Sequence, residues 1–597
     1  MLPYINQIPK SRSFISAFRG YNHNTHISEN ELYDDYNLTA DEYPVLSARK
    51  PRGISKYNAF GIYGLYGENG LCTIYADNAF GSMHLEYDGT EYDVTLTADY
   101  VPRRLVGFGT KILIFPDNVW FDTLSKQSGE IRTRTAMNNY ELQYGRPAED
   151  TMSPVNVDGE YYRFYLDEGE GPYIGDNRGI KDQDIYIMLK IPDTYLHADI
   201  DQDELRSRIG RYISQEVQNI ERRGNYYIFK GVIFDGNRPY NRMLVSDGDI
   251  LFQEYEDGDY VPFTPTYERD MTLHFNNVRP PLMDYVVECQ NRLWGCRKGL
   301  NRAGVEVNEI YASRLGTFDD WYSYEDTADS PYAASVGTPG DFTGVVKVSQ
   351  NPIFFKERCA HKVYVSSSGS HQIITLDVRG VQSGSGESIS TVNEIVYYKG
   401  VRDVLAFDGS NVSIVSDALG SARYINARSG AYGDKYVMYC EDEKSNKYIF
   451  SYDTRKGIWH RDLVDGAVVA MTDHGDDLLF CTDYALYSYN GNGDESESVS
   501  YMLESGVIGY ETADAKFLVR LDMRIKLGFG TTMTVWMQYD SDGKWIEAVR
   551  HRGTTVTPRM ETINVLPRRC DHFKYKITGK GDFQLYGLQK TYERSAK

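Results

Sequence analysis

The sequence predicts a mainly β fold: a β-propeller interrupted by an inserted α+β module and followed by a C-terminal β-sandwich-like domain. Three observations predict it: a composition of 50 Tyr, 53 Gly and 20 Pro in 597 residues, a repeated strand pattern, and alternating strands near the end. A tyrosine ring packs on a pleated surface while its hydroxyl stays in water, and Gly and Pro mark turns.

The repeat lies between residues 351 and 490. Apolar strand cores begin at Ile353, Ile395, Tyr436 and Leu478, so they are 41 to 42 positions apart, and a turn and a second strand follow each core. A period of about 40 to 50 residues built from short strands is typical of propeller blades. A β-sandwich with regularly spaced hairpins is the alternative, but it gives no reason for a repeat of this length.

The same pattern occurs earlier in the chain. Strands are predicted in 61–75 and 104–118, and the pattern resumes at 291–313. We therefore assign 57–145 and 284–492 to the propeller, with about six to eight blades by the usual blade size.

The interruption, 146–283, is rich in Asp, Glu and Tyr. Its apolar residues between 202 and 222 are spaced by three and four, which places them on one helical face. The spacing predicts a helix near 202–222, built on Ile209, Tyr212, Ile213, Val217 and Ile220.

The two ends of the chain differ. Residues 499–597 alternate around turns such as Asp540-Ser541-Asp542-Gly543 and predict an all-β domain of sandwich type. Residues 1–56 have little periodicity, and we expect an extended N-terminal arm that gains its burial from a neighbouring subunit.

The charge excludes several classes of protein. With 85 acidic and 64 basic side chains the formal charge is −21, which disfavours tight binding of nucleic acid. No stretch has the roughly 18 apolar residues that a membrane-spanning helix needs, and the start lacks a signal-peptide pattern. We expect a soluble protein that is not conventionally secreted.

The residues that usually carry chemistry are scattered. The seven cysteines predict buried free thiols in a reducing compartment more readily than a disulfide, and Cys289 and Cys296 lack the spacing of a zinc site. His23 and His26 are the only close histidine pair, in the arm, and we interpret them as solvated residues and not as a metal site. Protease, lipase, nucleotide-loop and dinucleotide motifs do not occur.

Acidic clusters are the remaining candidates for chemistry. They could supply the two carboxylates of glycoside cleavage or bind calcium, but 85 acidic residues produce such clusters by chance. We interpret them as solvated loops, so we assign no catalytic, cofactor-binding or metal-binding residue and expect a protein that is not an enzyme. The clusters are Asp319-Asp320, Glu325-Asp326, Asp473 with Asp476-Asp477, and Glu254 to Asp259.

Two short basic runs remain, Pro102-Arg103-Arg104 and Pro567-Arg568-Arg569. They are too short for a nucleic-acid groove. We expect them to pair with acidic surface on a neighbouring subunit.

Several segments together resemble the tail hub or nozzle proteins of short-tailed bacteriophages, also called DNA stabilisation or tail tubular proteins. They are spread over nearly the whole chain in consistent order. The segments are Tyr43 to Arg52, Leu105 to Asn118 with Ile114-Phe115-Pro116-Asp117, Asn291 to Gly295, Ile310 to Ser313, Asp320-Trp321-Tyr322, Phe354 to Glu357, Val404 to Gly409, and Arg569 to Phe573.

The resemblance implies a virion component assembled in the host cytoplasm. It implies a homo-oligomeric ring or tube, a hexamer, below the portal and adaptor proteins and near tail fibre, spike or needle proteins. The genome would be retained and ejected through the lumen without sequence-specific binding. The insertion 146–283 departs from the family pattern.

Two alternatives remain. One is a glycan-binding or glycan-cleaving propeller, for which 50 tyrosines could supply sugar-stacking platforms. The other is a general propeller scaffold for cytosolic assembly, which is disfavoured because the WD and kelch signatures are missing.

Overall fold

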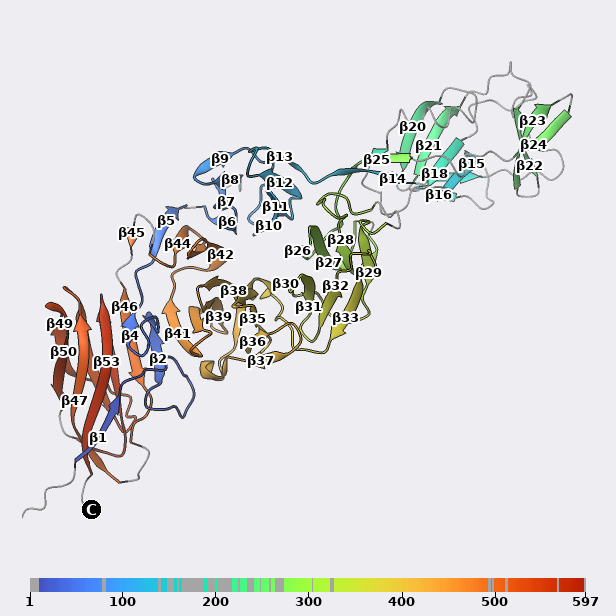
Figure 1. Ribbon diagram of the computed structural model, residues 1–597. Helices are drawn as coiled ribbons and strands as arrows, with labels where there is room; N and C mark the ends of the chain where they lie inside the picture. Colours follow the sequence, from blue (N-terminus) through green and yellow to red (C-terminus); the bar gives the residue numbers. More distant parts are fainter. Residues whose placement is uncertain are drawn as a thin grey trace, which may run out of the picture.

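The computed structural model confirms a mainly β protein (Figure 1). It describes residues 10–58, 60–77, 82–137, 273–302, 304–322, 327–491, 495–496, 499–509, 514–565 and 568–594, together with the strand backbones between 141 and 263. Across these residues the regular elements are strands and short 3₁₀ turns, among them η3 (Gly386–Ser388) and η4 (Asp417–Leu419).

Seven small antiparallel sheets form the propeller, each with four strands in chain order except the last, which adds a distant strand. The strands are β6 (Ile62–Tyr66), β7 (Cys72–Ala76), β8 (Met83–Tyr87) and β9 (Thr90–Tyr92) in blade 1; β10 (Arg104–Phe108), β11 (Lys111–Phe115), β12 (Val119–Asp122) and β13 (Ser128–Glu130) in blade 2; β26 (Tyr285–Cys289), β27 (Arg292–Leu300), β28 (Glu306–Ala312) and β29 (Tyr332–Ser335) in blade 3; β30 (Gly344–Val348), β31 (Asn351–Phe355), β32 (Ala360–Tyr364) and β33 (Gln372–Leu376) in blade 4; β34 (Ser390–Val392), β35 (Ile395–Lys399), β36 (Val404–Phe407) and β37 (Val412–Ile414) in blade 5; β38 (Tyr424–Tyr432), β39 (Lys435–Asp442), β40 (Lys447–Asp453) and β41 (Ile458–Leu463) in blade 6; and β42 (Val468–His474), β43 (Asp477–Thr482), β44 (Ala485–Ser488), β5 (Gly53–Tyr57) and β45 (Glu495–Ser496) in blade 7.

The innermost strands show that the blades close into a ring. The first strand of each blade contacts the first strand of the next, from β6 through β10, β26 and β30 and from β34 through β38 and β42 back to β6, while η3 contacts both β30 and β38. Strand β5, from near the N-terminus, pairs antiparallel with β44 and completes the last blade. The ring is therefore closed by a strand that is distant in sequence.

The repeat predicted from the sequence is the second strand of successive blades. The cores that begin at Ile353, Ile395, Tyr436 and Leu478 lie on β31, β35, β39 and β43. These strands read as continuous apolar runs because both faces are covered by neighbouring blades, and Phe354, Val396 and Val437 are fully buried.

The C-terminal domain is a sandwich of two sheets that share one apolar core. One sheet has the order β3-β4-β53-β47-β50, with β1 on β53 and β51 on β47; the other has the order β2-β46-β52-β48-β49. Its strands are β1 (Lys10–Ile15), β2 (Leu32–Tyr36), β3 (Leu38–Thr39), β4 (Leu46–Ala48), β46 (Ser500–Ser505), β47 (Lys516–Leu527), β48 (Thr532–Tyr539), β49 (Ile546–Arg552), β50 (Thr555–Asn564), β51 (Arg569–Cys570), β52 (Phe573–Lys580) and β53 (Phe583–Arg594).

The N-terminal arm belongs to this sandwich, which corrects the expected contact with a neighbouring subunit. Strand β1 pairs with β53 and β2 pairs with β46, in the same chain. Ile15, Phe18 and Leu32 are buried in the same core as Leu503 and Leu588. The arm has little periodicity because its short strands complete sheets whose other members lie at the opposite end of the sequence.

The insertion leaves the propeller after blade 2 and returns before blade 3. Strands β14 (Thr133–Met137) and β25 (Leu273–Val278) pair with each other, so the insertion begins before the predicted position 146. Its other strands are β15 (Glu141–Pro147), β16 (Val155–Val157), β17 (Glu160–Arg163), β18 (Tyr186–Lys190), β19 (Asp199–Ile200), β20 (Val217–Arg223), β21 (Tyr226–Val232), β22 (Asn241–Ser246), β23 (Asp249–Glu256) and β24 (Asp259–Phe263).

The helix predicted near 202–222 is wrong at its C-terminal end. Residues 217–223 form β20, which pairs antiparallel with β21, while residues 201–216 lie outside the described part. Val217 and Ile220 are β-branched and Gly224-Asn225 follows them. Ladder pairing across this hairpin outweighs a helical spacing that only two apolar residues support here.

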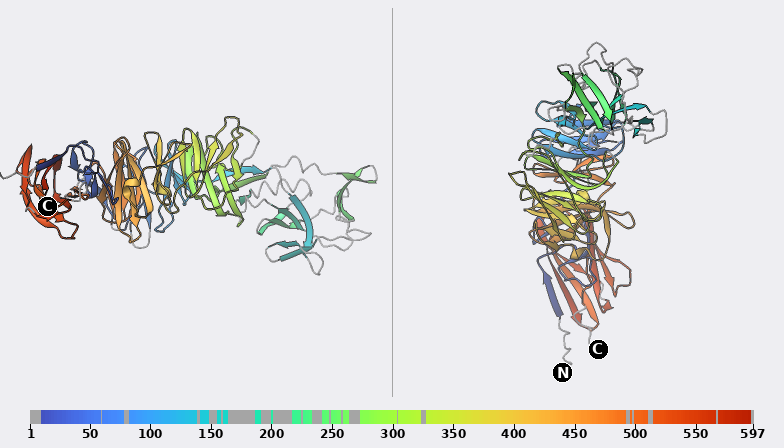
Figure 2. Two further views of the ribbon diagram at one scale, coloured as in Figure 1. Left: turned by 90° about the horizontal axis from the view of Figure 1, so that it is seen from below. Right: turned by 90° about the vertical axis from the view of Figure 1, so that its right-hand side faces the viewer.

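The molecule is elongated (Figure 2). The sandwich lies at one end, the propeller in the middle, and the strands of the insertion at the other end. The chain runs from the sandwich through the whole length and back, and sandwich strands β2 and β3 contact the outer strand of blade 6, β41.

Candidate functional site

The site begins with strand β41, the outermost strand of blade 6. An outer strand exposes a row of unpaired N–H and C=O groups. The arm covers this row: the backbone N–H groups of Tyr21 and Asn37 donate to the carbonyl oxygens of Trp459 and Arg461, over 2.7 and 2.9 Å. We call the contact of arm residues 20–52 with blade 6 the junction.

Side chains of the arm complete the same row. The backbone N–H of Arg461 donates to Asp35 Oδ1 over 3.1 Å, and that of Leu463 donates to Asn37 Oδ1 over 3.2 Å. Carboxylate and amide oxygens here replace the carbonyls that a further strand would supply. The outer edge of blade 6 is thus covered partly by backbone groups and partly by side chains of the arm.

Arg52 and Asp462 form a buried ion pair of the junction. Arg52 Nη2 lies 3.0 Å from Asp462 Oδ2, and the two side chains are 3% and 1% exposed. Arg52 Nη1 also donates to the carbonyl of Leu463 over 2.9 Å, and Arg49 Nε lies 3.7 Å from the same carboxylate oxygen. The guanidinium further contacts the ring of Phe480 in blade 7, 5.3 Å from its centroid.

A second buried pair joins sandwich strand β2 to β41. His460 Nδ1 lies 2.6 Å from Asp35 Oδ2, and both side chains are inaccessible to solvent. Beside it, Arg461 Nη2 lies 2.6 Å from Asp34 Oδ1. Burial raises the pKa of Asp34, and Arg461 opposes that rise.

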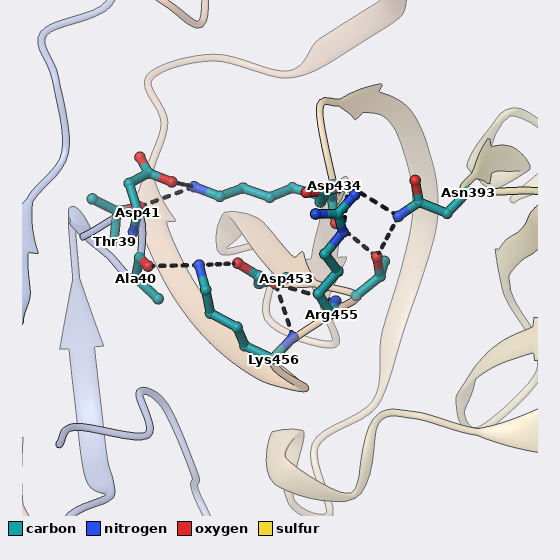
Figure 3. Close-up of polar contacts among 10 residues, drawn as sticks. Thr39, Ala40, Asp41, Asn393, Asp434, Asp453, Arg455 and Lys456 are labelled. Carbon is teal, nitrogen blue, oxygen red and sulfur yellow. Dashed lines mark hydrogen bonds and ion pairs between the residues drawn. The ribbon is translucent and has the colours of Figure 1, made fainter. Parts of the chain in front are cut away.

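A third part of the junction lies at the turn that follows β3 (Figure 3). Lys435 Nζ reaches Asp41 Oδ1 at 2.5 Å and donates to Thr39 Oγ1 over 2.9 Å, while Lys456 Nζ donates to the carbonyl of Ala40 over 3.0 Å. Burial disfavours the ionised form of Asp41, but Lys435 more than offsets this and holds the pKa below its usual range. Two lysines of blade 6, Lys435 and Lys456, therefore bind the turn at residues 39–41.

The axis of the propeller carries a different ion pair. Arg104, on the innermost strand of blade 2, pairs with Glu387 of η3, and its guanidinium lies 4.4 Å from the centroid of the Tyr285 ring. The Glu387 side chain is 56% exposed, yet desolvation by the protein around it still disfavours its ionisation; Arg104 outweighs this and holds its pKa below the usual range. Gly386 permits the approach, since a Cβ there would lie 2.6 Å from the Tyr285 ring.

The predicted acidic clusters have local roles where they are described. Asp477 is buried and accepts from Ser488 Oγ and from the backbone of Asn490, so it fixes a turn. Asp320 lies 3.8 Å from Arg314. Burial raises the pKa of Asp319 and of Asp473, on inner strand β42.

Two other clusters yield less. Residues 254–256 end β23 and Asp259 begins β24, which pairs with it; residues 257 and 258 lie outside the described part. Glu325 and Asp326 lie outside the described residues.

The structure shows the surroundings of His23 and of the cysteines. His23 stacks on Tyr33 and contacts its carbonyl oxygen over 2.9 Å. All seven cysteines are free, and six are buried, which confirms the predicted thiols. Among the described residues no three His, Cys, Asp or Glu side chains are grouped to hold a metal ion. No described helix is long and apolar enough to cross a membrane.

The basic runs pair within the chain, contrary to the expectation for Arg103 and Arg104. Arg103 lies 3.1 Å from Asp117, with both side chains buried, and Arg104 pairs with Glu387. Arg568 lies 3.7 Å from Asp542, and Arg569 is exposed.

Sequence reasoning did not find the junction. Arg49 and Arg52 belong to the segment that carries the family resemblance, but their partner Asp462 lies about four hundred positions away. The adjacent His460, Arg461 and Asp462 were the available signal, since three polar residues interrupt an otherwise apolar strand.

No protein-family model and no curated protein matches the chain. Solved structures that match include an exo-β-1,3-galactanase from Phanerochaete chrysosporium, at 9% identity and a TM-score of 0.19 over 51% of this chain and 94% of that one. Another is a GH43 glycoside hydrolase, at 8% identity and 0.20 over 53% and 100%. PorZ of the type-IX secretion system of Porphyromonas gingivalis matches at 11% and 0.23 over 94% and 86%.

These comparisons correct one expectation. The prediction that the chain is not an enzyme is contradicted, because glycoside hydrolases are among the structures that it matches. None of the proteins just named is a phage tail protein. At these identities and TM-scores the likeness assigns no activity to this chain.

Proposed function

We propose that the chain is a structural subunit of a short-tailed phage tail, forming a ring or tube through which the genome is retained and ejected. The observation that carries the proposal is the junction: Arg49 and Arg52, from the segment that resembles the tail hub and nozzle family, join the sandwich to the propeller. Two residues of the segment that carries the resemblance thus hold the sandwich and the propeller together.

The physical reason is the fixed orientation of two domains. A buried ion pair adds little net stability, but it tolerates few arrangements because a displaced charge would be left without its partner. Arg52 fixes the direction through two groups, the Asp462 carboxylate and the Leu463 carbonyl. A subunit that surrounds a pressurised conduit needs such a constraint.

The charge fits a conduit for DNA. A chain of formal charge −21 repels phosphates at short range, and salt limits that repulsion to about a nanometre. Proximity without adhesion follows if the acidic side chains line the lumen. The proposed partners are other copies in a hexamer, portal and adaptor proteins above, and fibre, spike or needle proteins nearby, in a virion tail assembled in the host cytoplasm.

Electron microscopy of the purified chain and of intact particles tests this proposal. We expect rings with a central channel, and in particles a ring stacked on a portal. A matched pair of variants links the result to the junction: Asp462→Asn should blur the angle between sandwich and propeller in class averages, whereas Asp434→Asn, in an exposed pair with Arg455, should not. The proposal would be contradicted if the purified chain stayed monomeric at all concentrations and the chain were not found in the tail of intact particles.

A glycan-binding or glycan-cleaving propeller is the second candidate, and the propeller axis favours it. Glu387 has a lowered pKa and Asp473 a raised one, and glycoside cleavage uses two carboxyl groups of which one is ionised and the other protonated. Tyr285 is the aromatic residue beside Glu387, and its ring packs against the Arg104 guanidinium.

A glycan panel separates the two candidates. Release of oligosaccharide by the purified chain, lost in Glu387→Gln and in Asp473→Asn but kept in Asp462→Asn, would establish the second. Binding without release, lost in Tyr285→Ala, would establish a lectin. Inertness on every glycan, together with rings, supports the tail subunit.

A further inference from the structure

Charge is distributed unevenly along the chain. Residues 499–597 carry 16 Lys and Arg against 11 Asp and Glu, although the whole chain has a formal charge of −21. The terminal segment is therefore basic, and the remainder, mostly propeller and insertion, is more acidic than the average suggests. Such an asymmetry favours contact between unlike parts of different molecules.

Some of these basic residues lie on two strands at the side of the sandwich that faces away from the propeller: Arg550 and Arg552 on β49 and Arg559 on β50. Strands β49 and β50 are the last strands of their sheets, they contact each other, and each pairs on one side only. Figure 1 shows them at the outer end, on the far side of the sandwich from β2 and β4. We call these two strands and the adjoining Arg568 and Arg569 the free edge.

Arginines and apolar side chains alternate along the free edge. Arg550 and Arg568 have side chains that are 66% and 54% exposed, and Arg552 and Arg569 are exposed as well. Ile546 and Met560 are also exposed, at 44% and 54%. Arginine is enriched at protein interfaces because it combines a charge with a large stacking surface.

We propose that the free edge docks onto acidic surface of the propeller of a second copy of this chain; residues 1–498 carry the remaining 48 Lys and Arg against 74 Asp and Glu. The inference rests on the proposed ring. Because the two surfaces differ, the contact is heterologous, and repetition around an axis closes a ring. A protein fits this edge better than nucleic acid: Glu547 and Glu561 lie among the arginines, the apolar side chains are exposed, and the outer strand has open backbone groups.

Sedimentation velocity of the full chain tests the proposal at low and high ionic strength. We expect association at low salt that is lost at high salt. The variant Arg550→Glu with Arg552→Glu should weaken association at least about tenfold, and keeps the edge charged and so protected from aggregation. The control, Arg379→Glu with Arg402→Glu, makes the same change in net charge on the propeller, where both residues are exposed. It should associate at least as strongly as the wild type, because it adds negative charge to the proposed acceptor.

Several outcomes would overturn the inference. They are association of the edge variant at wild-type strength, equal loss in the control, and association that does not respond to salt. Binding of duplex DNA that depends on Arg550 and Arg552 would assign the edge to nucleic acid instead. Circular dichroism and thermal melting verify the fold; if the double variant is unfolded, Arg550→Gln alone and the salt dependence of the wild type decide the question.

The test also separates this inference from the proposed function. If the edge variant forms normal rings, the subunit role remains and the docking surface is wrong. If neither chain forms rings and the wild type cleaves glycans, the role itself is wrong.

Discussion

Blade 4 and the junction both bury basic side chains, but they give them different partners. In blade 4, His361 lies between the hydroxyls of Thr338 and Thr375, at 2.7 and 3.1 Å. In the junction, His460 faces the carboxylate of Asp35 at 2.6 Å. The blade thus holds a neutral imidazole, whereas the junction holds its basic groups against acids.

The difference teaches where each region obtains its specificity. A blade is held by apolar packing on both faces, so its polar groups need only be satisfied. The junction also has apolar contacts, such as that of Tyr21 with Phe450, but it must in addition select one orientation of two domains. Paired charges achieve this, since removing either partner is far more costly than the pair is stabilising.

The largest loss of stability is expected from a substitution that removes a buried ion pair of the junction. Asp462→Ala leaves the buried Arg52 without its carboxylate, and we expect the free energy of unfolding to fall by about 3–5 kcal/mol in chemical denaturation. Asp434→Ala is the control, because its pair with Arg455 is exposed, and it should cost less than about 1 kcal/mol. Equal losses would remove the distinction between the two environments.

Low pH should destabilise the protein through His361 of blade 4. Burial lowers the pKa of His361 from 6.5 to about 4, so between these values the unfolded chain binds a proton that the folded chain refuses. Stability should fall with decreasing pH across this window, by up to about 1.4 kcal/mol per pH unit for this site.

The variant His361→Gln measures the contribution of this histidine. Its unfolding free energy should depend less steeply on pH between about 6.5 and 4 than that of the wild type. Parallel profiles would show that folding does not lower the pKa of His361, and the comparison with His460 would then lose its basis.

A backbone change tests the fit of the arm without touching a charge. Gly20 has φ of +68°, and a Cβ there would lie 2.4 Å from the carbonyl oxygen of Trp459. Gly20→Ala should cost about 1–2 kcal/mol from the left-handed conformation, and the clash adds to it. Limited proteolysis should cut the variant faster between 10 and 36; Gly433→Ala, also at positive φ but with open space, is the control.

The smallest effect is expected at the propeller axis, a third environment for an ion pair. Arg104 and Glu387 have side chains that are 23% and 56% exposed, so water screens their attraction. Arg104→Gln should cost less than about 1 kcal/mol, and high salt should remove the difference in thermal melting. A loss as large as that of Asp462→Ala would show that solvent exposure does not set the value of these pairs.

The blades could be predicted from the sequence because their information is local. Each of β31, β35, β39 and β43 is an apolar run with a turn after it, and the period between runs appears without knowledge of partners. The hairpin between β48 and β49 was predicted for the same reason, and Asp540, Ser541 and Gly543 do have positive φ.

The strands that complete blade 7 and the sandwich could not be predicted, because their pairing depends on a partner strand that is distant in the sequence. Nothing within Gly53–Tyr57 specifies β44, and nothing in Leu32–Tyr36 specifies β46. Both short strands gain their stability only when the distant sheet is present. The candidate site lies between such segments, so it was invisible for the same reason.

The position of β5 has a consequence for how the protein is made. A ribosome produces β5 and the arm first, yet their partners β44, β46 and β53 emerge near the end of synthesis. Domains fold as units from the N-terminus during translation, and this chain cannot follow that order. A prematurely terminated product lacks both the last blade and the sandwich, so its open strand edges mark it for proteolysis before it can compete with complete chains for a place in an assembly.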